Sequence, residues 1–183
     1  VNDFRVIMKT IKRGGVMFRK AAKEDVPVLE KILTEAWRQT YQKLYTTAYI
    51  ERVIEEFYNP TRLIDEVTHF SKDWSGYYVY EVEDKIVGCI AGGIEAEGVG
   101  SVYVLYLDPT EKRKGYGSQL LNHFTMMQKK TEGIGTQTVS VAENNQMGLP
   151  FYYKMGFIEK MKQKSRSSLE NEDYQTLILT REV

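Results

Sequence analysis

The segment from Leu105 to Ser118 carries the residue types most able to do chemistry, with the sequence Leu-Tyr-Leu-Asp-Pro-Thr-Glu-Lys-Arg-Lys-Gly-Tyr-Gly-Ser. A strand-forming run leads into a turn with three consecutive cations and two glycines, and a helix is expected to begin there. Glycines let a ligand approach the backbone closely, and the first N–H groups of a helix have no partner within it. The helix dipole adds partial positive charge, so this order of residues predicts an anion site, with phosphate as the expected group.

Two phosphate-binding motifs do not fit this turn. A P-loop needs Gly-Lys-Ser/Thr at a fixed distance after a first glycine, and the chain has no such run here. A dinucleotide fingerprint needs a third glycine where Leu120 follows Gly115-Tyr116-Gly117. Taken alone, the turn has a plain alternative, which is a charged surface turn with glycines for tightness.

A second motif follows the next expected strand, at residues 145–157, with the sequence Asn-Gln-Met-Gly-Leu-Pro-Phe-Tyr-Tyr-Lys-Met-Gly-Phe. Its asparagine, small residue, Phe-Tyr pair and Gly-Phe pair, placed downstream of the glycine turn, are much more specific than the turn alone. With both motifs in this order, the chain resembles the GNAT superfamily of acyl-CoA-dependent N-acetyltransferases. The order of elements is similar from about Met17 to Arg181, and the likeness is loosely nearest to the branch that includes bacterial polyamine acetyltransferases.

The resemblance implies acetyl-CoA as the cosubstrate. Residues 112–117 are similar to the family's Arg/Gln-x-x-Gly-x-Gly/Ala pyrophosphate loop, with a lysine at the first position. Backbone N–H groups from Arg113 to Ser118 are expected to hold the pyrophosphate, and the family's splayed strand places residues 105–107 beside the pantetheine. Asn145 is expected to bond the pantetheine, and Lys154 to reach the nucleotide phosphates. The expected cofactor-binding residues are Leu105, Tyr106, Leu107, Lys112, Arg113, Lys114, Gly115, Tyr116, Gly117, Ser118, Asn145 and Lys154.

The resemblance also places Tyr152 at the position of the family's general acid. In family chemistry an amine attacks the thioester directly, a backbone N–H of the splayed strand holds the oxyanion, and a tyrosine protonates the departing thiolate. The alternative role for Tyr152 is that of a core residue packing its helix on the sheet. The neighbouring Tyr153 is expected to face another side of that helix.

The general base is less clear in the sequence. Many relatives place a glutamate early in the central strand, and the matching position here is Ser101. Glu97 and Glu95, in the turn before it, could act through a water molecule, and Glu97 joins Tyr152 as an expected catalytic residue. A glutamate in an exposed turn is more often a solvated charge, and an amine that arrives deprotonated needs no dedicated base.

The elements that must position these residues follow from hydrophobic periodicity. Helical spacing of apolar residues predicts helices before the sheet, between the two motifs and within the second motif. Strands are expected at residues 16–19, 77–82, 85–90, 102–107, 138–141, 157–164 and 174–180. Residues 102–107 are apolar on both faces, which predicts a central strand covered on both sides.

The predicted fold class is α/β: a single-domain GNAT fold with a mixed, mostly antiparallel central sheet of six to seven strands and about four to five flanking helices. Residues 17–183 are assigned to the N-acetyltransferase domain. Residues 1–16 are treated as an N-terminal extension to which no function is given.

Composition excludes several classes. The 183 residues suit one domain, and 25 basic against 25 acidic side chains give no net field to attract nucleic acid. One cysteine, Cys89, and two histidines exclude a disulfide scaffold and a Cys/His zinc module, so no metal is expected. Cys89 is expected to be a buried small hydrophobe. The chain has no apolar run of membrane-spanning length, so no membrane association and a cytoplasmic location are expected.

The acceptor and the functional class stay open to alternatives. A small-molecule amine is the first expectation, a protein N-terminus or lysine the second, and a homodimer is common in the family. Trp37, Tyr41 and Tyr45 could line an acceptor pocket or pack in the core. A non-catalytic acyl-CoA sensor, suggested by Ser101, is the alternative function, and an interaction module without cofactor requires both motifs to be coincidental.

Overall fold

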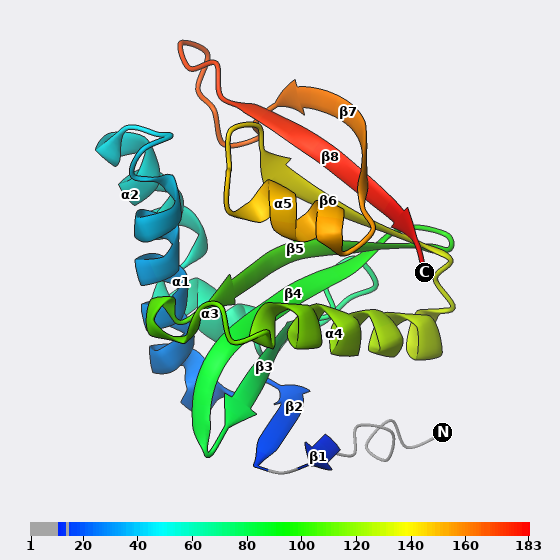
Figure 1. Ribbon diagram of the computed structural model, residues 1–183. Coiled ribbons are helices and arrows are strands. Elements are labelled where there is room, and N and C mark those ends of the chain that lie inside the picture. Colours follow the sequence, from blue (N-terminus) through cyan, green and yellow to red (C-terminus); the bar gives the residue numbers. More distant parts are fainter. Residues whose placement is uncertain (1–10, 14) are drawn as a thin grey trace.

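The computed structural model describes residues 11–13 and 15–183 (Figure 1). Its strands are β1 (Ile11–Arg13), β2 (Val16–Lys20), β3 (Tyr77–Val82), β4 (Lys85–Ala96), β5 (Val99–Leu107), β6 (Thr136–Ala142), β7 (Ile158–Lys164) and β8 (Gln175–Glu182). Its helices are α1 (Val26–Tyr41), α2 (Thr47–Phe57), α3 (Pro60–Glu66), α4 (Tyr116–Glu132) and α5 (Gly148–Lys154), with short 3₁₀ turns at Lys23–Asp25 and Pro109–Glu111.

The strands form one mixed sheet in the order β1-β2-β3-β4-β5-β6-β8-β7. Only β5 and β6 pair in parallel among the described strands, and all other neighbours are antiparallel. The predicted single α/β domain with a mixed, mostly antiparallel sheet is confirmed.

The sheet has one strand more than the sequence predicted. The additional strand is β1, which pairs with β2 from Ile11↔Phe18 to Arg13↔Val16. It belongs to the segment assigned to the N-terminal extension, residues 1–16, of which residues 1–10 and 14 lie outside the described residues. Residues 11–13 of this segment therefore extend the sheet beyond β2.

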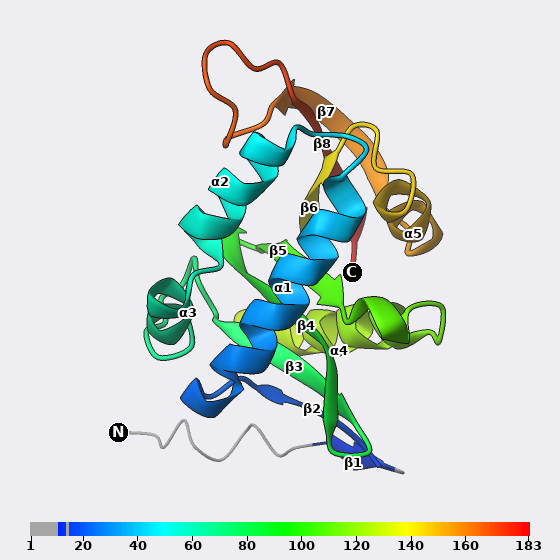
Figure 2. The ribbon, with the colours of Figure 1, turned by 90° about the vertical axis from the view of Figure 1, so that its left-hand side faces the viewer.

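Helices cover both faces of the sheet and create two hydrophobic clusters. Leu29, Leu33 and Trp37 on α1 pack with α2, α3 and one face of β3 to β5. Figure 2 shows α1 lying across the strands with α2 and α3 on the same side. On the opposite face, α4 and α5 pack against residues such as Ile90 and Val139. The i, i+3, i+4 spacing of the apolar residues explains these amphipathic helices.

Local sequence signals explain several boundaries. Glu83 and Asp84 have φ values of +50° and +62°, which suits a two-residue hairpin between the strands expected at residues 77–82 and 85–90. Asn59 begins α3 by accepting a hydrogen bond from the Arg62 backbone N–H at 2.9 Å. Gly133 ends α4 in the left-handed conformation, with φ +65°.

The central strand β5 is irregular at Tyr103. Val102 pairs with Gly92 and Val104 with Ala91, so Tyr103 is the additional residue of a β-bulge. The prediction that residues 102–107 are covered on both sides is wrong at this position, because Tyr103 is 49% exposed. The bulge turns Tyr103 out of the regular alternation of side chains, which periodicity in the sequence does not reveal.

The pairing of β5 with β6 ends early. It extends from Val99↔Thr136 to Val102↔Val139, after which β5 continues beside β4 and β6 beside β8. The two strands therefore separate near the middle of the sheet.

Among the described residues, no helix is long and apolar enough to cross a membrane.

The β4–β5 pair depends on a glycine beside the bulge. A Cβ atom at Gly92 would lie 1.9 Å from the Ser101 carbonyl oxygen, which is backbone and cannot rotate away. We therefore expect Gly92→Ala to lower the free energy of unfolding by about 3 kcal/mol or more, at the upper end of overpacking costs. Urea unfolding should measure this loss. Gly135→Ala is the matched control, because its Cβ would meet no atom within 4 Å; an equal effect of both variants would contradict the prediction.

Candidate active site

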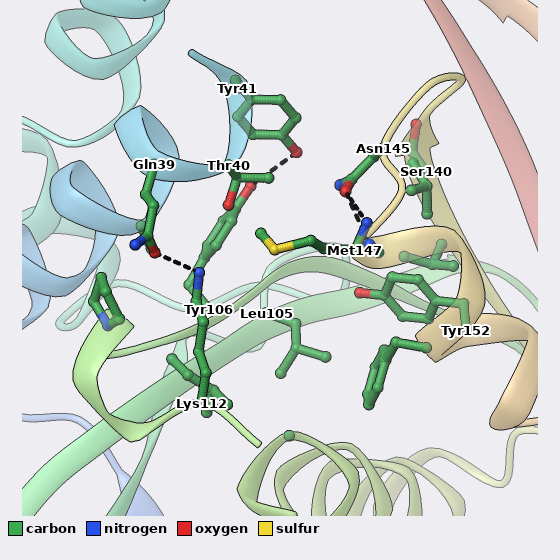
Figure 3. A pocket seen from close by; sticks show the side chains of 18 of the residues that line it. Gln39, Thr40, Tyr41, Leu105, Tyr106, Lys112, Ser140, Asn145, Met147 and Tyr152 are labelled. Carbon is green, nitrogen blue, oxygen red and sulfur yellow. Dashed lines mark hydrogen bonds between the residues drawn. The ribbon is translucent and has the colours of Figure 1, made fainter. Parts of the chain in front are cut away.

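A cavity of about 850 Å³ lies where β5 and β6 separate (Figure 3). It is bounded by α1, β5, β6, α5 and the loop before α4. The residues lining it are Ala36, Gln39, Thr40, Tyr41, Tyr103, Leu105, Tyr106, Leu107, Pro109, Lys112, Arg113, Gly117, Val139, Ser140, Val141, Asn145, Met147, Gly148, Phe151 and Tyr152. Among these lining residues there is no carboxylate, while Lys112 and Arg113 are cationic, so the cavity suits an anionic ligand.

The separated strands give the cavity two free backbone edges. Leu105, Tyr106 and Leu107 keep their ladder with β4 but have no partner on the β6 side. Ser140 and Val141 likewise pair only with β8. Unpaired strand N–H and C=O groups are a template for an extended ligand, which can hydrogen-bond along them as an additional strand does.

The loop before α4 has the backbone geometry of an anion site. Arg113 and Gly115 have φ values of +66° and +82°, and Gly115 begins α4 without a side-chain cap. The N–H groups of the first turn, at Tyr116, Gly117 and Ser118, therefore lack intrahelical partners and point out of a 17-residue helix. At Arg113, which is not a glycine, the left-handed conformation costs roughly 1 kcal/mol. This conformation turns successive backbone N–H groups toward one another, and such a cluster of N–H groups is typical of an anion site.

The cations of this loop point in different directions. Lys112 lies at the cavity mouth, where its Nζ donates to Gln39 Oε1 of α1 at 2.6 Å, and partial burial lowers its pKa. Lys114 instead donates to Glu111 Oε2 at 2.7 Å and does not line the cavity. Of the three basic residues of the run, Lys112 and Arg113 therefore line the cavity and Lys114 does not.

Asn145 has a structural role beside the cavity. Its Oδ1 accepts hydrogen bonds from the backbone N–H groups of Met147 at 3.2 Å and Gly148 at 2.8 Å, which fixes the start of α5 (Figure 3). The residue is buried and lines the cavity. Its amide nitrogen is the part of the side chain left to donate to a ligand.

Tyr152 is buried on α5, and its hydroxyl points into the cavity (Figure 3). Burial, with a smaller contribution from Tyr41, raises its pKa well above the ordinary value for tyrosine. The phenol is therefore neutral at physiological pH and is placed to donate a proton. Tyr153 is exposed and bonds Glu159, as expected for a neighbour on another side of the helix.

Two further phenols lie near Tyr152. Tyr41 Oη and Tyr106 Oη are 3.3 Å apart, and burial raises the pKa of both residues. Three aromatic residues were candidates for lining an acceptor pocket. Tyr41 lines the cavity, whereas Trp37 and Tyr45 pack in the hydrophobic cluster of α1 and α2.

The structure thus brings together eight of the predicted residues in one cavity. They are Leu105, Tyr106, Leu107, Lys112, Arg113, Gly117, Asn145 and Tyr152. Lys114, Gly115, Tyr116, Ser118, Lys154 and Glu97 do not line it. For Lys114, Gly115, Tyr116 and Ser118 the expected contact is through the backbone, so this does not affect the expectation. Glu97 lies in the exposed turn between β4 and β5, and Lys154 is exposed at the end of α5.

Sequence reasoning missed the contributions of Gln39, Thr40 and Met147 to the cavity. Gln39 and Thr40 lie on α1, far from both motifs, and no local pattern marks them. Met147 lies inside the second motif at a position without a family role, and it projects over the cavity (Figure 3).

Comparison with known proteins gives a family match. The chain matches the family profile described as an acetyltransferase (GNAT) domain over residues 73–159, which contain both motifs. It is similar to a spermidine N(1)-acetyltransferase of Thermoplasma acidophilum, with 31% identity over 144 residues that cover 78% of this chain and 88% of the relative.

Solved structures show the same architecture. The crystal structure of PaiA N-acetyltransferase from Thermoplasma acidophilum in complex with coenzyme A has a TM-score of 0.78 and 27% identity, covering 92% of this chain and 99% of that chain. Ard1 from Thermoplasma volcanium has a TM-score of 0.68 over 92% of this chain and 98% of that chain. Its identity of 18% supports the fold alone.

The single cysteine lies outside this site, and we expect its thiol not to react with thiol reagents in the folded protein. Cys89 is fully buried, and burial raises the pKa of its thiol to about 12. Because the thiolate is the nucleophile, we expect no reaction of the native protein with Ellman's reagent at pH 8. One equivalent should react after unfolding in urea. A fast reaction under native conditions would show that the β4 face is open to solvent.

Proposed function

The chain belongs to the GNAT superfamily of N-acetyltransferases, and we propose that it moves the acetyl group of acetyl-CoA to a primary amine of a small molecule by direct attack. The observation that supports this most strongly is the separation of β5 and β6 after the Val102↔Val139 pair. It creates a cavity with an anion-binding loop at one end and the neutral phenol of Tyr152 in its wall.

The proposed binding of acetyl-CoA uses the residues of both motifs. Backbone N–H groups from Arg113 to Ser118 hold the pyrophosphate, assisted by the Lys112 side chain after it leaves Gln39. The pantetheine lies along the free edge of residues 105–107, and the Asn145 amide donates to it. Lys154 is exposed on the last turn of α5, and its contact with the nucleotide phosphates stays a prediction.

The proposed chemistry is a direct transfer. A deprotonated amine attacks the thioester carbonyl, a C–N bond forms and the C–S bond breaks. A backbone N–H on the free edge of β5 stabilises the oxyanion, and Tyr152 gives its proton to the departing thiolate. The nitrogen that becomes the amide loses one proton, and the uptake of one proton by the Tyr152 phenolate restores the neutral phenol. The raised pKa of Tyr152 keeps its hydroxyl protonated throughout the neutral range.

Among acceptors, we propose a small amine of the polyamine class first, since a spermidine acetyltransferase is similar over most of its length. Acceptors that are protein N-termini are a second class to test, and the proposed location is the cytoplasm, where acetyl-CoA is available. The non-catalytic sensor rested on Ser101 at the family's glutamate position, and nothing else in the site favours it.

The role of Tyr152 can be tested by removing its hydroxyl oxygen. We expect Tyr152→Phe to lower kcat by roughly 100-fold, because acid catalysis is lost, while the Kd for CoA stays near wild type. Steady-state kinetics and calorimetry measure the two quantities. Tyr153→Phe is the matched control on the same helix, since its hydroxyl faces Glu159 at the surface. An unchanged kcat in Tyr152→Phe would end this assignment.

The cofactor site can be tested at Gly117. A Cβ atom there would lie 3.5 Å from Phe151 and 3.7 Å from Leu107, all of which line the cavity. Alanine is accommodated by ordinary contacts, but the branched methyl groups of valine enter the cavity. We expect Gly117→Val to raise the Kd for acetyl-CoA at least tenfold, or about 1.4 kcal/mol, in a calorimetric titration. Gly117→Ala should stay within about twofold of wild type; equal affinity in Gly117→Val would mean that the loop is misassigned.

A further inference from the structure

Glu95 is a carboxylate at the end of β4, directly behind the point where β5 and β6 separate. Its Oε2 accepts hydrogen bonds from Ser101 Oγ at 2.6 Å and from Thr138 Oγ1 at 2.8 Å. Ser101 and Thr138 are register partners in the parallel β5–β6 pair, one step before its last pair, Val102↔Val139. Both hydroxyl-bearing residues are buried, whereas Glu95 itself is exposed.

The hydrogen bonds leave half of the carboxylate free. Ser101 and Thr138 each have one hydroxyl proton, and both protons can point to Oε2. Their donation lowers the pKa of Glu95, with Ser101 the largest cause and Thr138 the next, so the group is charged at neutral pH. No residue in the described part of the chain bonds the other oxygen, Oε1, which is therefore available to a ligand.

An aromatic ring connects this carboxylate with the cavity. Tyr103 is the bulged residue of β5, lines the cavity and is 49% exposed. Its ring stacks on Trp74 with centroids 6.3 Å apart and planes 5° from parallel. Tyr103 follows Ser101, a donor to Glu95, by two residues on β5, so the ring and the carboxylate belong to the same short stretch of the sheet. Burial raises the pKa of Tyr103, and the charge of Glu95 is the next cause. A carboxylate beside an exposed aromatic face suits an alkylammonium ion.

From this geometry, and resting on the proposed function, we infer that Glu95 binds a protonated nitrogen of the acceptor other than the nitrogen that is acetylated. The acceptor class that follows is a diamine or polyamine. One of its nitrogens is deprotonated and attacks the thioester, and another is a protonated ammonium group that lies between Glu95 Oε1 and Tyr103. Glu95 is then a specificity-determining residue for the acceptor.

A proton-accepting role fits Glu95 poorly. A carboxylate whose charge is stabilised by two hydroxyl donors is a weak base toward an ammonium ion, although it attracts that ion electrostatically. Glu97, the other carboxylate near this turn, lies in the exposed connection and makes no hydrogen bond with a described side chain. The anchored position of Glu95 is what distinguishes it from a solvated surface charge.

Other charges face Glu95 and set the strength of this interaction. Arg166, in the β7–β8 connection, and Lys160, on β7, both act to lower the pKa of Glu95. From the segment before β3, the negative charge of Asp73 acts on Tyr103. An acceptor ammonium therefore competes with two exposed cations, and removing one of them should favour binding.

The experiment compares wild type with Glu95→Gln, which keeps an acceptor oxygen for Ser101 and Thr138 and removes only the charge. Steady-state kinetics with spermidine and with n-butylamine separate a diamine effect from a general one. We expect Glu95→Gln to raise the KM for spermidine roughly fivefold, the size of a partly exposed ion pair, with kcat within twofold. The KM values for n-butylamine and acetyl-CoA should stay unchanged, and Arg166→Gln should lower the KM for spermidine.

Three outcomes would overturn the inference. A fall in kcat for both amines at saturation would make Glu95 part of the chemistry, and a raised KM in Glu97→Gln alone would move the site to that residue. Equal KM values in Glu95→Gln and wild type would remove its role. If the wild type binds acetyl-CoA but acetylates no amine, the proposed function fails separately. Calorimetric titration of spermidine into the CoA-saturated protein then still decides about Glu95, because the inference requires roughly fivefold weaker binding in Glu95→Gln.

Discussion

The separation of two parallel strands in the middle of the sheet is the constraint on which the site depends. An interior sheet normally pairs every backbone N–H and C=O group, and leaving such groups unpaired in a buried place is costly. Here β5 and β6 leave each other after Val102↔Val139, yet each keeps its other neighbour, β4 or β8, along its length. The cost is therefore confined to two facing edges. Those edges line a cavity that an extended ligand can fill, so a local defect in the sheet becomes a binding surface.

The helices on this face complete the site because of where their ends lie. The loop before α4 turns through left-handed conformations at Arg113 and Gly115 and leaves the first N–H groups of the helix without intrahelical partners, and Gly117 of this first turn lines the cavity. At the start of α5, Asn145 satisfies two backbone N–H groups itself, so this short helix is fixed without a ligand. The first arrangement favours a bound anion, and the second fixes the position of Tyr152. In the proposed function, charge recognition and proton donation therefore belong to different helices.

Much of the fold was predictable because its signals are local. Hairpin residues at Glu83 and Asp84, the glycine that ends α4, and the periodicity of α1 each depend on a few neighbouring residues. The contacts of the site were less predictable. Lys114 points to Glu111, three residues earlier, while Lys112 crosses to Gln39 on α1, and the basic run gives no sign of this difference. The bulge at Tyr103 is set by the register with β4, and Glu95 meets Thr138 only because the sheet brings β4, β5 and β6 together.

At Ser101 the chain lacks the glutamate that the family resemblance leads one to expect, and a carboxylate from the neighbouring strand lies beside this position. The position where many relatives have a glutamate carries a hydroxyl here, which suggested a loss of function when only the strand itself was considered. In the folded chain that hydroxyl and Thr138 hold the carboxylate of Glu95, which comes from the neighbouring strand β4. A negative charge therefore lies beside Ser101, and a carboxylate held by two donors stabilises a cation better than it accepts a proton. On the inference made for Glu95, the neighbouring strand supplies an electrostatic contact for the acceptor beside the position where the family resemblance leads one to expect a base.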